Sequence, residues 1–139
     1  MFTKILVAYD GSDHARKAAA IARELATKLH SDVWLVVAYD PLPSYLGKPN
    51  VQAVIDSRMD HAEAQMKEAV KAIGNIPGKV TREVLEGPAS EAILDVAGVR
   101  KIELIIMGTR GLGSLKGLLI GSTSQKVLSH ALCPVLLAR

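Results

Sequence analysis

The segment at residues 108–124, GTRGLGSLKGLLIGSTS, contains the residue types in this sequence that are best suited to hold a ligand. It combines five glycines with several serine and threonine hydroxyls, and it follows directly on the apolar run at 104–107. Glycine at this density costs backbone entropy and gives no side chain to pack, so a purely structural loop rarely needs it. A ligand that contacts the main chain does need it.

The same segment suggests an anion as the ligand. A helix that opens at Gly121 would present free N–H groups and the positive end of its dipole, which attract phosphate. Arg110 and Lys116 could neutralise phosphate charge, although either side chain could instead face water. The residues that we expect to bind phosphate share this segment: Gly108, Arg110, Gly111, Gly121, Ser122, Thr123 and Ser124.

Two common phosphate-binding motifs do not match. The chain has Gly-Lys pairs only at 47–48 and 78–79, and neither is followed by the serine or threonine that a P-loop requires. Gly111, Gly113 and Gly117 are spaced one residue too widely for the dinucleotide-binding fingerprint, and they follow the fourth predicted strand rather than the first.

A second polar group, DGSDH, follows the first apolar run. Asp10 could accept hydrogen bonds from a ribose, or it could be a turn residue before Gly11. Ser12 is expected to cap a helix. Ser12, Asp13 and His14 are consecutive, so their side chains point in different directions and cannot form a catalytic triad. A metal site formed by Asp10 and Asp13 stays an open alternative, whereas the spacing of the histidines does not predict a zinc site.

Strand and helix patterns alternate along the chain and must position these residues. Strands are expected at 4–9, 32–39, 79–86, 102–108 and 133–139. Helices are expected at 12–29, at 51–73, at 87–100 with Pro88 in the first turn, and at 122–132. The three prolines in residues 40–50 predict a long irregular loop.

This alternation predicts a doubly wound α/β fold, with an open, five-stranded parallel sheet and helices on both faces. Ligands bind such sheets at the carboxyl ends of the strands, where the winding direction reverses. The loops after the first and fourth strands become neighbours if those strands flank the reversal. The length of 139 residues predicts a single domain over residues 1–139.

The composition argues against several classes of partner. The net charge is only +3 and there are five aromatic residues (one Trp, three Tyr, one Phe), so nucleic acid is not expected. No apolar stretch reaches membrane-spanning length and the first apolar run is too short for a signal peptide, so we expect no membrane association. The single cysteine, Cys133, fits a reducing compartment, and we expect a cytoplasmic protein.

The glycine segment also resembles the ATP-binding branch of the universal stress protein family. The resemblance lies in a glycine, two residues, a glycine, nine residues, a glycine and a hydroxyl residue, running from Gly108 to Ser122. It extends to KILVAYDGSDHA, GPASEAIL and CPVLL, in that order along the chain. It implies strand order 3-2-1-4-5, a dimer, and ATP or a related adenine nucleotide bound between strands one and four.

Carried over by position, the resemblance assigns the base and ribose to Ala8, Asp10, Ala38 and Met107. It assigns the phosphates to Gly108, Gly111, Gly121, Ser122 and Thr123. Ala8, Tyr9 and Ala38 depart from the residues usual at their positions, and Ala38 stands where valine is common. These departures alter the shape of the base pocket, so they affect base selectivity rather than phosphate binding.

Three functions fit these observations. The first is a non-catalytic, ATP-binding stress or signalling protein, with Mg²⁺ carried in by the triphosphate and with protein partners that the sequence does not identify. The second is a slow ATPase or nucleotidyl transferase, although no general base, water-positioning glutamine or acidic cluster is readable beside the loop. The third and weakest is a phosphoacceptor receiver, because the chain lacks the aspartate that would end strand three and the lysine that would end strand five.

The edge strands predict how the protein assembles. In the order 3-2-1-4-5, the edge at 79–86 carries four charged residues, which discourage pairing with another sheet. The other edge, PVLLA at 134–138, carries none. We therefore expect a homodimer in which the C-terminal strand pairs with its own copy across a two-fold axis.

Overall fold

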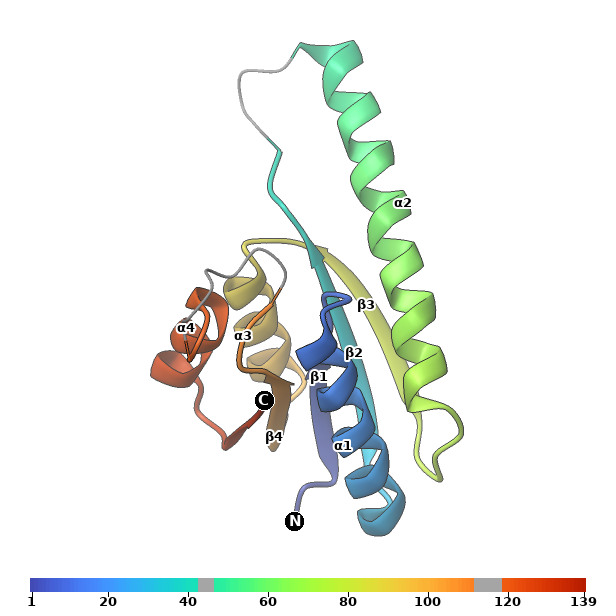
Figure 1. The fold of residues 1–139 in the computed structure, drawn as a ribbon, viewed down its shortest axis with the longest axis vertical. Coiled ribbons are helices and arrows are strands. Elements are labelled where there is room, and N and C mark those ends of the chain that lie inside the picture. Colours follow the sequence, from blue (N-terminus) through green and yellow to red (C-terminus); the bar gives the residue numbers. More distant parts are fainter. Residues whose placement is uncertain (43–46, 112–118) are drawn as a thin grey trace.

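The computed structural model describes residues 1–42, 47–111 and 119–139, and a parallel five-stranded sheet forms its centre (Figure 1). The strand order is β3-β2-β1-β4-β5, and every neighbouring pair is parallel, as expected. The strands are β1 (Lys4–Ala8), β2 (Asp32–Tyr39), β3 (Val80–Glu86), β4 (Leu104–Gly108) and β5 (Val135–Ala138). The winding direction reverses between β1 and β4, which places the predicted switch point there.

Helices cover both faces of the sheet, which confirms the doubly wound fold. They are α1 (Asp13–Leu29), α2 (Lys48–Ile73), α3 (Ala89–Val99) and α4 (Ser122–His130). In β1, Ile5 and Val7 pack into the core under α1 and α2, while Leu6 packs into the core under α3 and α4. All three side chains are fully buried, which explains why this strand reads as a continuous apolar run.

The start of α1 lies close to the end of β4. Ser12 caps the helix as predicted, because its Oγ accepts the N–H of Ala15 at 3.1 Å. A Cβ added to Gly108 would lie 2.6 Å from the Cβ of His14 in the first turn of α1. Glycine at 108 therefore lets helix and strand approach, a packing reason that the phosphate interpretation of this residue did not include.

Several predicted boundaries differ from the structure by one or two residues, and two differences change the local structure. Helix α2 begins at Lys48, inside the stretch 40–50 that was expected to be irregular. Pro49 is compatible with this because proline is tolerated in the first turn of a helix, where its missing N–H has no intrahelical partner. Pro88 is the N-cap residue of α3 and precedes its first turn.

The N-terminal half of α2 extends beyond the sheet (Figure 1). No described helix has the length and apolarity needed to cross a bilayer.

Candidate functional site

The turn after β1 places Asp10 at the carboxyl edge of the sheet. Its Oδ1 accepts the N–H of Ser12 at 2.9 Å, so the turn role that the sequence left open for Asp10 is present. Gly11 has a φ of +82°, which only glycine adopts easily. The carboxylate also lies against the main chain of Gly111, where an added Cβ would be 2.2 Å from Asp10 Oδ2. Asp10 thus shapes the turn and faces the loop after β4.

Main-chain bonds bring the two ends of the glycine segment together. The buried Thr109 donates its N–H to the carbonyl of Ala138 at 2.8 Å, and its own carbonyl accepts the N–H of Gly121 at 2.7 Å. The residues between, 112–118, lie outside the described residues and include Lys116. Gly121 therefore stands beside the end of β4 although it is separated from Thr109 by a long stretch of sequence.

The N-terminus of α4 faces the same region. Gly121 is the N-cap and has no side chain to cap the helix, so the first N–H groups form an anion-attracting end. Its φ of −75° suits any residue, so the backbone angle does not require glycine here. Ser122 is exposed, whereas the buried Ser124 donates its Oγ–H to the carbonyl of Gly108 at 2.7 Å. The hydroxyl hydrogen of Ser124 is thus directed at the main chain.

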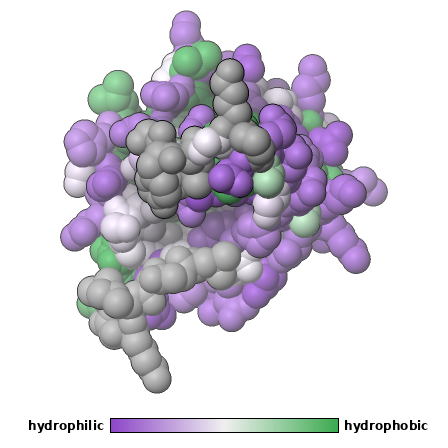
Figure 2. Space-filling model, turned by 90° about the horizontal axis from the view of Figure 1, so that it is seen from above, coloured by the Kyte–Doolittle hydropathy of each residue, from purple (hydrophilic) through white to green (hydrophobic). Residues whose placement is uncertain are grey.

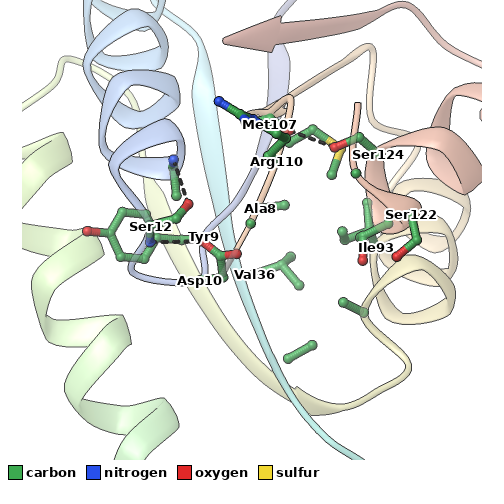
Figure 3. Close-up of a pocket in the computed structure, with 17 residues that line it drawn as sticks. Ala8, Tyr9, Asp10, Ser12, Val36, Ile93, Met107, Arg110, Ser122 and Ser124 are labelled. Atoms are coloured by element: carbon green, nitrogen blue, oxygen red, sulfur yellow. Dashed lines mark hydrogen bonds between the residues drawn. The ribbon is translucent and has the colours of Figure 1, made fainter. Parts of the chain in front are cut away.

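These loops enclose a cavity of about 320 Å³ at the carboxyl ends of β1 and β4 (Figure 3). Every site residue predicted from the sequence lines it: Ala8, Asp10, Ala38, Met107, Gly108, Arg110, Gly111, Gly121, Ser122, Thr123 and Ser124. Figure 3 shows Asp10 and Ser12 on one side of the cavity and Ser122 and Ser124 of α4 on the other. Figure 2 looks onto this edge of the molecule, where hydrophilic residues form most of the coloured surface.

The lining divides by polarity. Apolar side chains from β1, β2, α3 and β4 form one part: Ala8, Val36, Ala38, Ile93 and Met107. The other part is polar and combines Asp10, the first turn of α4 and the main chain of the loop after β4. Such a cavity can hold a flat apolar ring at one end and an anionic group at the other.

Arg110 is directed toward α1. Its guanidinium donates to Nε2 of His14 at 3.4 Å, and Nδ1 of His14 lies 2.9 Å from the Thr109 hydroxyl. Among the described residues that line the cavity, Arg110 and Asp10 are the charged ones. Among the described parts of the chain, no group of three or more His, Cys, Asp and Glu is arranged to hold a metal ion.

The sequence analysis named Tyr9 only as a departure that alters the base pocket, and it missed several other lining residues: Ser12, Ala15, Val36, Ala89 and Ile93. Val36 could have been found, because it lies two residues before Ala38 in the same strand and therefore on the same face. Ile93 and Ala89 belong to α3, and only the tertiary packing brings that helix to the cavity.

Tyr9 carries the clearest electrostatic perturbation. Its ring is buried and its hydroxyl donates to Oε1 of Glu68 at 2.5 Å. Burial, followed by the hydrogen bond and the negative charge of Glu68, raises the pKa of Tyr9 to about 12. The same hydrogen bond, followed by that from Arg16, lowers the pKa of Glu68. The turn after β1 is thus tied to a charged group on α2.

Comparison with known proteins places this geometry in a family. The sequence profile of the universal stress protein family matches residues 1–139. A Thermus aquaticus protein, the universal stress protein in QAH/OAS sulfhydrylase 3′ region, is 46% identical over 142 residues, which is 100% of both chains.

Solved structures agree. Universal stress protein UspA from Lactobacillus plantarum has a TM-score of 0.88 and 26% identity, and the match covers 99% of this chain and 98% of that chain. The universal stress protein from Archaeoglobus fulgidus in complex with dAMP shares the fold, with a TM-score of 0.76 and 22% identity over 100% of both chains. The whole-chain profile and the Thermus relative together establish that this chain belongs to the universal stress protein family.

Proposed function

We propose that this protein binds ATP, or a closely related adenine nucleotide, and acts as a nucleotide-dependent stress or signalling dimer in the cytoplasm. The observation that carries the proposal is the divided cavity at the switch point. Its apolar part and its donor-rich part lie within one space of about 320 Å³, the size of a small-ligand pocket.

The residues fit the parts of a nucleotide. In this proposal the base lies among Ala8, Val36, Ala38, Ile93 and Met107, which offer an apolar slot. Asp10 accepts hydrogen bonds from the ribose, as acidic residues do in other nucleotide-binding folds. The phosphates lie at the N-terminus of α4, where Gly121 leaves space and where Ser122 and Thr123 add hydroxyl donors.

The charged partners of the phosphates follow from the same arrangement. Arg110 lines the cavity and donates to His14 at 3.4 Å, and exchanging that partner for a phosphate oxygen would pair its guanidinium with an opposite charge. Mg²⁺ would arrive with the triphosphate and neutralise part of its charge. The protein's own contribution is to bind and orient the nucleotide.

Isothermal titration calorimetry with ATP, GTP and adenosine tests the proposal, with phosphate release measured on the same samples. ATP should bind more tightly than adenosine, because the α4 end contributes only when phosphates are present. ATP should also bind more tightly than GTP, because the apolar lining offers few partners for the polar edge of guanine. Equal affinity for ATP and adenosine would contradict the phosphate site, and rapid phosphate release would favour an ATPase instead.

The dimer is proposed to form through β5. This strand is at the edge of the sheet, and two leucines beside it, Leu128 and Leu132, are 42% and 104% exposed. An uncharged edge next to exposed apolar side chains suits pairing with a second copy. Sedimentation velocity at micromolar concentration should show a dimer that Leu132→Asp weakens. Leu29→Asp is the control, because this leucine is also exposed, at 41%, and ends α1, away from β5 in the sequence and outside the pairing edge. A stable monomer for the parent protein would rule the dimer out.

A further inference from the structure

Gln65 of α2 holds the turn after β1. Its Nε2 donates to the main-chain carbonyl of Asp10 at 2.6 Å. It is also packed against the next residue, because a Cβ added to Gly11 would lie 3.3 Å from the same nitrogen. The described residues that line the cavity include none from α2, so Gln65 contacts the turn without contacting the cavity.

Glu68, one helical turn further along α2, fastens both flanks of the same turn. Its Oε1 accepts the hydroxyl of Tyr9 at 2.5 Å and the guanidinium of Arg16 at 3.0 Å. Arg16 in turn donates to the carbonyl of Gly11 at 2.7 Å. Three consecutive residues, 9 to 11, are thus each hydrogen-bonded by a side chain from α1 or α2.

We propose that Gln65 and Glu68 are positioning residues for the ribose of the bound nucleotide. The inference rests on the proposed function and adds residues that do not contact the ligand. A carbonyl held at 2.6 Å fixes the peptide plane that follows Asp10, and the hydroxyl bond to Glu68 anchors the side chain of the preceding residue, Tyr9. The direction of the Asp10 carboxylate is therefore set before the ligand arrives, which spares the binding step the cost of ordering it.

This role is distinguishable from simple packing. If Gln65 and Glu68 only supported the fold, removing their contacts would weaken the binding of all nucleotides alike. If they position Asp10, removing these contacts weakens the binding of ligands that carry the ribose hydroxyls and spares the binding of ligands that lack them. ATP and 2′,3′-dideoxy-ATP differ only in those hydroxyls, so the ratio of their dissociation constants reports the position of Asp10.

The first experiment measures both ligands by calorimetry on the full-length protein and on Gln65→Met, which keeps the chain length and removes the donor. We expect ATP to bind roughly five-fold more weakly, the effect of one lost hydrogen bond, with little change for 2′,3′-dideoxy-ATP. Gln52→Met is the matched control on the same helix, because the Gln52 amide donates to Asp56 at 2.9 Å, far along α2 from the turn. It should leave both affinities unchanged.

Glu68→Leu and Glu68→Gln form the second test. Leucine removes the acceptor for Tyr9, whereas glutamine keeps an amide oxygen that can accept it. The dissociation constant of 2′,3′-dideoxy-ATP divided by that of ATP should shrink in Glu68→Leu and be largely restored in Glu68→Gln. Thermal unfolding is recorded for each variant. An unchanged ratio in both Gln65→Met and Glu68→Leu overturns the inference, as does a parent protein that binds ATP and 2′,3′-dideoxy-ATP equally. A parent protein that binds neither ligand refutes the proposed function itself.

Discussion

The two loops that line the cavity are held by different kinds of bond. Side chains of α1 and α2 hold the turn after β1: Arg16, Gln65 and Glu68 each donate to it or accept from it. Main-chain groups hold the ends of the loop after β4, through Thr109 and its bonds to Ala138 and Gly121. The turn after β1 therefore depends on side chains from two helices, whereas the loop after β4 depends mainly on main-chain bonds, to which Ser124 Oγ and His14 add side-chain contacts.

Because the two loops are held differently, substitutions in them should weaken ligand binding for different reasons. A side-chain change on α1 or α2 removes a hydrogen bond behind the turn after β1. A side chain added to the loop after β4 fills space at the phosphate end or forces the backbone apart. The four predictions that follow test this difference. A variant of one loop that shows the effect expected for the other loop would contradict it.

Gly121→Val should have the largest effect, with ATP binding lost to below detection. Gly121 is buried beside the end of β4, so a branched side chain would occupy space that the phosphates need. Its φ of −75° suits valine, so the change tests space rather than backbone strain. Calorimetry measures the binding, and circular dichroism checks the fold. A folded variant that binds ATP as tightly as the parent would show that this loop does not hold the phosphates.

The turn after β1 should respond to alkaline pH through Tyr9. The folded pKa of about 12 lies above the usual 10.0, so the folded state retains its proton more strongly than the unfolded state. The contribution of Tyr9 to the free energy of unfolding is therefore constant below about pH 10 and falls by about 3 kcal/mol as the pH rises through 12. Urea unfolding across this range should show the fall, and Tyr9→Phe should remove that part of the slope. An identical slope in both proteins would contradict the buried phenol.

Two glycines of the loop after β4 should differ in what they affect. Gly108→Ala places a Cβ 2.6 Å from His14 Cβ in a packed interface, so we expect a loss of about 2 kcal/mol of stability. Gly111→Ala displaces the Asp10 carboxylate from its set direction, because the added Cβ would lie 2.2 Å from Asp10 Oδ2. Its stability should change little while ATP binding weakens about five-fold. Urea unfolding and calorimetry on both variants measure the two effects, and equal destabilisation would contradict the distinction.

Ser122→Ala should weaken ATP binding more mildly than Gly121→Val. The exposed hydroxyl can add one charge-assisted hydrogen bond to a phosphate, so its removal should weaken ATP binding by about 1–2 kcal/mol. Adenosine binding should be unchanged. Ser129→Ala on the same helix is a suitable control, because the Ser129 hydroxyl is bonded to the Gln125 carbonyl at 2.9 Å. A loss of adenosine binding in Ser122→Ala would place this residue at the wrong end of the ligand.

Much of this arrangement could be predicted from sequence, because local patterns carry it. The alternation of strands and helices follows from apolar periodicity, and the residues at strand ends follow from the switch-point rule. Ala8, Asp10 and Gly121 all line the cavity, as expected. The strand order came from the family resemblance rather than from the pattern.

The residues behind the site could not be found in this way. Gln65 and Glu68 lie far from Asp10 in the sequence, and polar residues on an amphipathic helix usually face water. Only the packing of α2 on α1 and β2 brings them to the turn. The contact of Gly108 with His14 is equally invisible in sequence, because a glycine gives no sign of whether a ligand or a neighbouring helix needs the space.

Because α2 is long, a small rotation of this helix near the site corresponds to a larger movement of its outer end. Its 26 residues extend well past the sheet, and Asn50 stands about 22 Å along the helix axis from Gln65, at 1.5 Å per residue. A tilt of about 5° about Gln65 would therefore move the outer end by about 2 Å while shifting the Asp10 carbonyl only slightly. For a rigid helix, a small adjustment at the turn would thus correspond to a larger displacement at the far end of α2.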